Sequence, residues 1–388
     1  MEVGLSLARL SADVRGTVRI ASPHAVEGTI SLDRAAIETL SAAAEGKQRE
    51  GLGGVVSARF EITGPLKTPE QLRVSGSVNS LDLLVGNARF TLASPAEIEW
   101  TEGAIALPGA LLLGEGSRLS LSGRIFPGDP VRFDARLQGE ADLRTFQPLV
   151  RDASLRGAAR LDVKATGTPT SPVISGTVTV SEGRLRRFDA PVVIENLSLN
   201  VEMSPGVIDI REISAAVGGG TVRGSGRVTI DGLKPLAVEA IVRASAVTIS
   251  APRGFRAAYS GTVRLSGAAE RPVATGDLEI VRGVYTKDFR LESFSLGART
   301  REFAPEPADS QSPGGGLELD IRLHADDNLW LKNDFGEVEN RAQLVLSGTL
   351  ARPRITGRIV ALEGGEIHFR RVDYRLREAA LEMAEPDS

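Results

Sequence analysis

The chain contains no cysteine, few aromatic residues and no long apolar run. The absence of cysteine excludes disulfides, thiolate metal sites and thiol nucleophiles. Because only 4% of the residues are aromatic, any buried surface must be lined mainly by Val, Leu, Ile and Ala. No stretch approaches the ~20 uninterrupted apolar residues that a membrane-spanning helix needs. The start, from Met1 to Leu5, lacks a basic region followed by an apolar one, so it does not predict a signal peptide.

The chain also lacks a large excess of either positive or negative charge. The 46 basic and 50 acidic residues give a formal net charge of −4 and are scattered along the whole length. A nucleic-acid-binding protein would need a concentrated basic surface. The charge pattern therefore argues against nucleic acid as a partner.

What the sequence has in abundance is alternation of apolar and polar residues with a period of two, which is typical of β-strands. One dry and one wet face indicate antiparallel pairing rather than a parallel sheet covered on both sides. We therefore predict an all-β fold with an antiparallel-rich sheet. The apolar members of the clearest runs are the candidate lining residues: Leu119, Leu121, Phe133, Leu137, Leu199, Val201, Leu317, Leu319, Ile321, Leu323, Leu344 and Leu346.

Helices are expected to be few and short. Asp33 to Glu45 has helical composition, with Ser31 or Asp33 as the cap, and Asp142 to Val150 predicts a short helical turn. Neither is long enough to cover a large sheet. Residues 45–54 and 304–316 are rich in Gly, Pro and polar residues, which predicts loops.

A turn motif repeats along the chain. Each copy places Pro five residues after one Gly, and a second Gly four residues after the Pro. This order predicts a strand, a tight turn and a second strand, and the irregular distance between copies favours an open array of strands over a closed propeller. The three copies run from Gly167 through Pro172 to Gly176, from Gly267 through Pro272 to Gly276, and from Gly348 through Pro353 to Gly357.

No catalytic residue, metal site or cofactor is assigned. His24, His324 and His368 are far apart in the sequence and are interpreted as solvated side chains on strands. Asp326 to Asn328 lacks the Gly and the distal Glu of a calcium loop, so a turn is expected there. The triple-glycine stretches 218–220 and 314–316 do not open helices and so predict no phosphate site.

The apolar faces of such strands have two possible fates. They can bury one another in a closed sandwich or β-helix, which is the commoner outcome of this pattern. They can instead join into an open groove, which the scarcity of covering helices favours. The sequence pattern alone leaves both open. A β-helical carbohydrate enzyme is disfavoured, because no acids and aromatics cluster on one face.

The repeated turns lead to a family resemblance. Together with Gly218 to Gly226, Leu113 to Gly123 and the closing run from Leu319 to Phe369, they resemble the AsmA-like proteins, and most closely the TamB (translocation and assembly module subunit) family. The likeness is strongest from about Asp142 onward. It implies a long sheet curled into an open, hydrophobic groove, a β-taco-like array. Residues 1–141 would then be the N-terminal part of the array, with one short helix, and residues 142–388 a groove like the TamB C-terminal domain.

The resemblance also implies a place and a role. It implies a periplasmic protein anchored to the inner membrane that carries phospholipids between the two membranes without catalysis. The alternative role is a scaffold for the assembly of outer-membrane and autotransporter proteins. The implied partners are phospholipid acyl chains and an outer-membrane barrel assembly protein. We expect the chain to be a segment of a longer protein, with membrane contact made through termini that are missing here.

Overall fold

The computed structural model describes residues 2–7, 12–18, 25–45, 51–65, 73–86, 88–101, 103–128, 130–149, 153–187, 193–250, 253–287, 316–334, 336–369 and 372–384. By its internal contacts the chain divides into unit 1, residues 1–184 and 200–206, and unit 2, residues 185–199 and 207–388. The division passes through β12 (Ser171–Arg187) and β13 (Val193–Ser204). The boundary expected between residues 141 and 142 stays a prediction.

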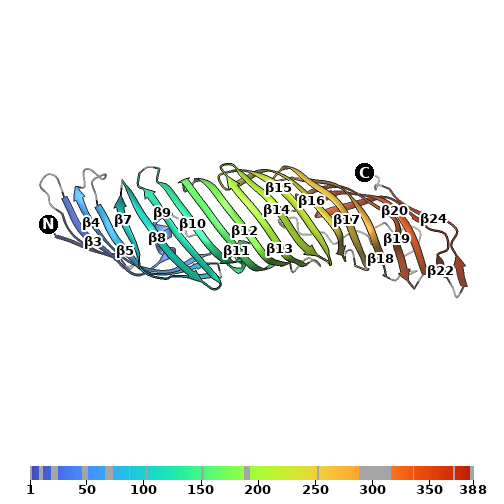
Figure 1. Cartoon of the computed structure of the whole chain (residues 1–388), viewed down its shortest axis with the longest axis horizontal. Coiled ribbons are helices and arrows are strands. Elements are labelled where there is room, and N and C mark those ends of the chain that lie inside the picture. The colour runs from blue at the N-terminus through green and yellow to red at the C-terminus, as the bar shows by residue number, and fades with distance from the viewer. Residues whose placement is uncertain are drawn as a thin grey trace. The chain divides into compact units, whose positions relative to one another are not determined.

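Unit 1 is built almost entirely of strands, as predicted (Figure 1). Besides β12, its elements in chain order are β1 (Glu2–Leu7), β2 (Ala12–Val18), β3 (Ala25–Ala36), α1 (Ile37–Glu45), β4 (Leu52–Pro65), β5 (Arg73–Val85), β6 (Ala88–Leu92), β7 (Ala96–Thr101), β8 (Ala104–Gly114), β9 (Ser117–Phe126), β10 (Arg132–Asp142), the 3-10 helix η3 (Leu143–Leu149) and β11 (Ala153–Thr168).

Unit 2 is likewise all-β. Its remaining strands are β14 (Val207–Val217), β15 (Gly220–Asp231), β16 (Lys234–Ile249), β17 (Phe255–Ala268), β18 (Val273–Tyr285), β19 (Glu318–Asn333), β20 (Gly336–Thr349), β21 (Arg352–Ala361), β22 (Glu366–Phe369), β23 (Val372–Arg375) and β24 (Ala379–Met383). In the described parts of the chain no helix has the length and apolarity needed to cross a bilayer.

Successive strands mostly pair with each other in antiparallel order, for example β14 with β15, β15 with β16 and β16 with β17. One described pair, β18 with β19, is parallel. A parallel pair cannot be joined by a tight turn, because the chain must return along the length of a strand. Residues 286–317 join the two strands in the sequence, and most of them lie outside the described residues.

The repeated turn motif forms hairpins, as predicted. Its first copy joins β11 to β12, its second joins β17 to β18 and its third joins β20 to β21. The second Gly of each copy lies where the neighbouring strand is closest. A Cβ atom on Gly176 would lie 2.1 Å from the carbonyl oxygen of Asp162, and one on Gly357 would lie 2.2 Å from that of Gln343. Only glycine fits these positions, which explains why the motif keeps it.

The predicted helix exists, but its predicted start and caps were wrong. Strand β3 continues through Ala36, and α1 begins only at Ile37. A bulge at Arg34, whose φ is 49°, returns the strand to register, so that Ala35 pairs with Val56. Pairing with β4 thus overrides local helix propensity. The predicted turn at Asp142 to Val150 is confirmed as η3.

Two predicted irregular segments also need correction. Asp326 to Asn328 is not a turn but a bulge within β19, where the pairing with β20 shifts between Ala325 and Leu329. Asn328 has a φ of 58°, and its backbone N–H donates to Glu339 Oε1 at 2.9 Å. The loop predicted over residues 45–54 is shorter, because β4 begins at Leu52. Residues 46–50, and most of the loop predicted at 304–316, lie outside the described residues.

Candidate apolar binding surface

The strands of unit 2 align their apolar residues into rows that cross the sheet. Directly opposed residues can be followed from β14 to β21, one residue per strand. The central row consists of Ile213, Gly224, Val242, Val263, Gly276, Ile321, Leu346 and Ile355. Every member is aliphatic or glycine, so the row presents no hydrogen-bonding side chain.

Two flanking rows have the same character. They lie two residues away on each strand and therefore on the same face, except that a bulge on β14 separates Ile210 from Ile213 by three residues. One consists of Ala215, Val222, Ala244, Gly261, Leu278, Leu323, Leu344 and Gly357, and the other of Ile210, Gly226, Ala240, Leu265, Ala274, Leu319, Gly348 and Pro353. We call these three rows the unit 2 lining.

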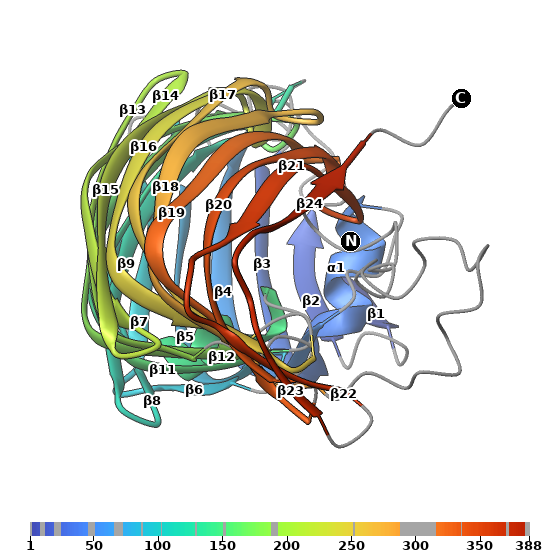
Figure 2. The ribbon, with the colours of Figure 1, turned by 90° about the vertical axis from the view of Figure 1, so that its right-hand side faces the viewer.

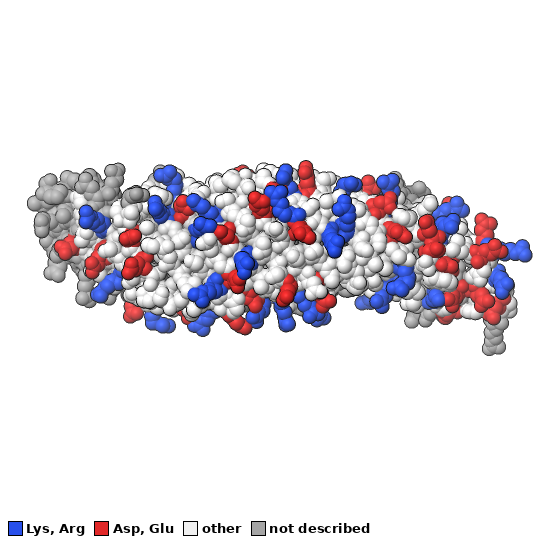
Figure 3. Space-filling view, in the orientation of Figure 1, with Lys and Arg blue, Asp and Glu red and all other residues white. Residues whose placement is uncertain are grey.

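The opposite face of the same strands is polar. Its row between the central row and one flanking row consists of Ser214, Arg223, Arg243, Thr262, Asp277, Arg322, Val345 and Thr356. Strands β15 to β20 bend along their length (Figure 2). Figure 3 looks onto the convex side of these strands, where Lys and Arg are interspersed with Asp and Glu. The convex side is therefore exposed to solvent, and the lining faces the concave side.

The lining is covered only in part. Leu319 and Ile321 are 8% and 7% exposed, while most lining residues around them are half-buried. Among the described residues no large side chain is less than 2% exposed; only small ones such as Ala325 reach 0%. A sandwich core would bury large aliphatic side chains completely, since a second sheet packs onto the first. The described strands of unit 2 instead belong to one sheet.

Unit 1 has a lining of its own. Across β8 to β11, opposed residues form rows such as Ala110, Leu121, Leu137 and Val163. Phe90, Leu112, Leu119 and Leu161 pack into one buried cluster on this face. The outer face carries ion pairs between β10 and β11, including Arg136 with Asp162 at 2.8 Å and Lys164 with Asp134 at 3.0 Å. We call the apolar face of β6 and β8 to β11 the unit 1 lining.

Comparison with known families identifies the second half of the chain. Residues 211–385 match the family model of the TamB C-terminal domain. This part of the chain is a TamB C-terminal domain. The resemblance drawn from the sequence is thereby confirmed. Searches of curated proteins and of solved structures found no match.

The TamB family consists of membrane-associated periplasmic proteins involved in outer-membrane protein assembly and lipid transport. Within this chain the family match begins in β14 and ends just beyond β24. It therefore includes the whole β15-to-β21 part of the unit 2 lining. The lining is thus a feature of the TamB domain itself.

The structure brings the predicted residues of the TamB domain together. Leu319, Ile321, Leu323, Leu344 and Leu346 all belong to the unit 2 lining, and Leu317 packs against the cluster that contains Leu319 and Ile321. In unit 1, Leu119, Leu121, Phe133 and Leu137 share one face of β9 and β10. Leu199 and Val201 are half-buried at alternate positions of β13. That these residues bind a ligand stays a prediction.

Sequence reasoning missed the small residues of the lining. Gly224, Gly226, Gly261 and Gly276 occupy positions in the three rows, whereas only large apolar residues were predicted. A signal was present, because Gly220, Val222, Gly224 and Gly226 alternate like any apolar strand face. Glycines in a strand leave shallow depressions, since they carry no side chain.

Titratable groups are almost confined to the outer face of the described strands. His324 pairs with Asp277 at 3.1 Å and His368 with Asp373 at 2.6 Å, with histidine side chains 43% and 49% exposed. His24 lies outside the described residues. One titratable group on the lining side is Tyr259, opposite Val247 and Ile280. Burial raises the pKa of its phenol to about 12, because desolvation disfavours the charged form.

Proposed function

We propose that the protein carries phospholipid acyl chains along its apolar lining, between the inner and the outer membrane, without a catalytic step. The observation that carries this proposal is the unbroken set of apolar rows from β14 to β21, which are only partly covered. Membership of residues 211–385 in the TamB C-terminal domain family supports it. We further propose that the protein works in the periplasm, attached to the inner membrane in its full-length form.

The energetics explain why a continuous lining matters. Moving the acyl chains of a phospholipid with ~30 methylenes from an apolar environment into water would cost a free energy of roughly 24 kcal/mol, at ~0.8 kcal/mol for each methylene. A lipid can cross an aqueous space only if an apolar surface accompanies its chains throughout. With strands ~4.8 Å apart, the three rows offer such a surface over at most about 34 Å within unit 2. Headgroups would stay in water at the open side.

The test uses two neighbouring residues on opposite faces of β20. Leu346→Asp places a carboxylate in the central row, whereas Val345→Asp places the same group on the polar face, opposite Arg322. Leu346 is half-buried, so the replacement burdens folding less than one at Ile321 would. Both variants are purified, checked by circular dichroism, and analysed for bound phospholipid by mass spectrometry.

We expect Leu346→Asp to lower the bound phospholipid several-fold and Val345→Asp to leave it unchanged. The wild-type protein must carry phospholipid for the proposal to stand. Equal lipid content in all three folded proteins would refute it, because acyl chains that lie on the lining would desolvate the new carboxylate and therefore bind more weakly.

A second function is favoured by the last strands. Strand β24 pairs with β21 on one side, and the described residues place no strand on its other side. Val372, Tyr374 and Leu381 are 50%, 53% and 53% exposed. An exposed strand edge can bind another protein by adding a strand, as a scaffold for outer-membrane protein assembly would require. Photo-crosslinkers at Tyr374 and Leu381 would then trap a barrel protein in cells, while crosslinkers at Thr356 would not.

A further inference from the structure

The rim of unit 1 has a notch at the ends of β9 and β10. The turn between β8 and β9 comes directly after Gly114, which lies opposite Phe90 of β6. Strand β10 ends at Asp142, which lies opposite Ala158 of β11. The flanking strands continue past both points, β6 by residues 88–89 and β11 by residues 153–157. Three strands, β8, β9 and β10, therefore stop short between two that do not, β6 and β11.

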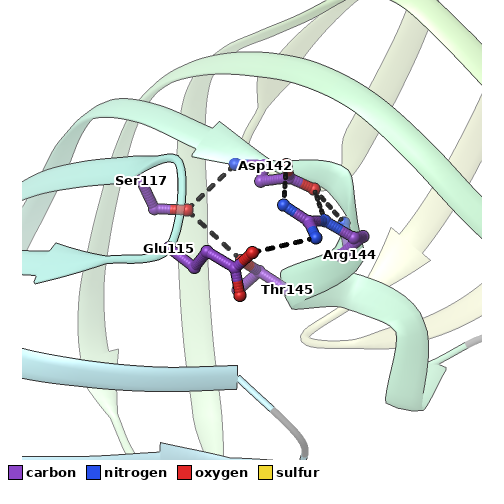
Figure 4. Close-up of polar contacts among 5 residues, drawn as sticks. All are labelled: Glu115, Ser117, Asp142, Arg144 and Thr145. Atoms are coloured by element: carbon purple, nitrogen blue, oxygen red, sulfur yellow. Dashed lines mark hydrogen bonds and ion pairs between the residues drawn. The ribbon is translucent and has the colours of Figure 1, made fainter.

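Helix η3 lies at the base of this notch and is fastened there (Figure 4). The backbone N–H of Asp142 donates to Ser117 Oγ at 2.9 Å. Arg144 donates to Asp142 Oδ2 at 2.9 Å and to Glu115 Oε1 at 3.1 Å. The hydrogen bond from Arg144 is the main cause that lowers the pKa of Asp142 below its usual value. The base of the notch is thus held by contacts to both strand ends.

The side chain of Gln147 replaces the missing strand next to β11. Its Oε1 accepts a hydrogen bond from the backbone N–H of Leu155 at 2.8 Å, and its Nε2 donates to the carbonyl oxygen of Ala153. One amide side chain therefore satisfies two backbone groups that a neighbouring strand would otherwise pair. Because a side chain is narrower than a strand, space remains beside it.

That space is a cavity of about 740 Å³. The charged residues of its lining are Arg89, Arg144 and Arg156 and one acid, Glu115. Arg89 is held by Asp82, and Arg144 by Asp142 and Glu115. The guanidinium of Arg156 is exposed and has no hydrogen bond or ion pair to the described residues. Among the residues that the structure describes, this cation of the cavity lining therefore has no counter-charge.

Apolar residues also line the cavity, and they connect it to the unit 1 lining. Phe90 lines the cavity and is also a member of the buried cluster with Leu112 and Leu119. Leu113 and Leu155 add further apolar surface. A molecule in the notch would therefore meet both the positive charge of Arg156 and apolar surface that continues into the unit 1 lining. That combination fits an amphiphile with a negative headgroup.

We propose that the notch binds the anionic headgroup of a phospholipid whose acyl chains lie on the unit 1 lining, with Arg156 pairing with the headgroup. This inference rests on the proposed function, which places acyl chains on the lining, and adds a site that selects headgroup charge. Arg144 is a positioning residue, since its guanidinium is held by hydrogen bonds to Asp142 and Glu115.

The experiment compares two soluble lipids with identical acyl chains, dioctanoyl phosphatidylglycerol, which is anionic, and dioctanoyl phosphatidylcholine, which is zwitterionic. Binding to the whole chain is measured by calorimetry for wild type, Arg156→Glu and Arg156→Gln. The matched control is Arg223→Glu, which makes the same charge change on the outer face of β15. Glycerol 3-phosphate and inorganic phosphate are measured as headgroup probes without acyl chains.

We expect wild type to prefer the anionic lipid, and Arg156→Glu to weaken its binding about tenfold, as loss of a charge-assisted hydrogen bond does. The zwitterionic lipid and the Arg223→Glu variant should be unaffected. Arg156→Gln decides the matter if the glutamate variant does not fold. Three results would each overturn the proposal that the notch binds an anionic headgroup. The Arg156 variants could weaken both lipids equally, they could affect neither lipid, or glycerol 3-phosphate could bind wild type as tightly as the lipid does. If wild type binds neither lipid, the proposed function itself fails.

Discussion

Ile321 of β19 lies directly opposite Leu346 of β20, and on its other side it lies opposite Gly276 of β18. A large side chain is thus placed next to a residue with none, and the described strands form no second sheet over them. Ile321 is only 7% exposed, because its neighbours along and across the strands surround it. Its packing is lateral, between residues of one sheet.

Lateral packing predicts a graded cost of truncation along the central row. Ile321→Ala should lower the free energy of unfolding by about 2–3 kcal/mol, since it opens a gap between packed neighbours. Ile355→Ala, in the same row but 40% exposed, should cost less than about 1 kcal/mol. Urea denaturation followed by circular dichroism measures both. Equal costs at the two sites would contradict lateral packing as the source of stability.

The hairpin motif predicts strict intolerance at its second glycine. Gly176 has a φ of 133°, and a Cβ there would lie 2.1 Å from the Asp162 carbonyl oxygen. Gly176→Ala should therefore destabilise the protein by about 2–3 kcal/mol through strain and displacement of β11. Gly109→Ala is the control, because nothing lies within 4 Å of its added Cβ, and should change stability by less than about 1 kcal/mol. The thermal midpoints of the two variants distinguish these outcomes.

The two hydrogen bonds of the Gln147 side chain predict that its removal destabilises the start of β11. Gln147→Ala leaves the Leu155 N–H and the Ala153 carbonyl without their side-chain partner, which costs about 1–3 kcal/mol when the groups are sheltered from water. Hydrogen exchange at the Leu155 amide should then be at least about tenfold faster. Gln343→Ala, an exposed change on β20, should leave that amide unaffected. Unchanged exchange at Leu155 would mean that another group supports this end of β11.

The raised pKa of the Tyr259 phenol predicts that the protein loses stability at alkaline pH. Its folded-state pKa is raised to about 12, so the neutral phenol stabilises the fold fully below the ordinary pKa of about 10. That contribution is lost as the pH rises from about 10 through 12. The difference in unfolding free energy between wild type and Tyr259→Phe should therefore change over this interval and stay constant below it. A constant difference throughout would show that the phenol is not desolvated.

The sequence predicts the strands of this fold well and their partners less well. Alternation alone places Leu319, Ile321 and Leu323 on one face, and the Gly-Pro spacing locates three hairpins. The parallel pairing of β18 with β19 carries no local signal, because the alternating pattern is the same for either direction. The bulge at Asn328 depends on Glu339 across the sheet. The notch depends on where β9 and β10 stop relative to β6 and β11, which only the register between strands determines.

The uniformity of the unit 2 lining has a consequence for transport. Each row offers an acyl chain much the same aliphatic surface at every strand, with no polar group to mark a preferred stop. The binding free energy of an acyl chain would then be nearly the same at every strand, so lipid on the lining would diffuse equally in both directions. Any net flux must then come from supply at one terminus of the track and removal at the other.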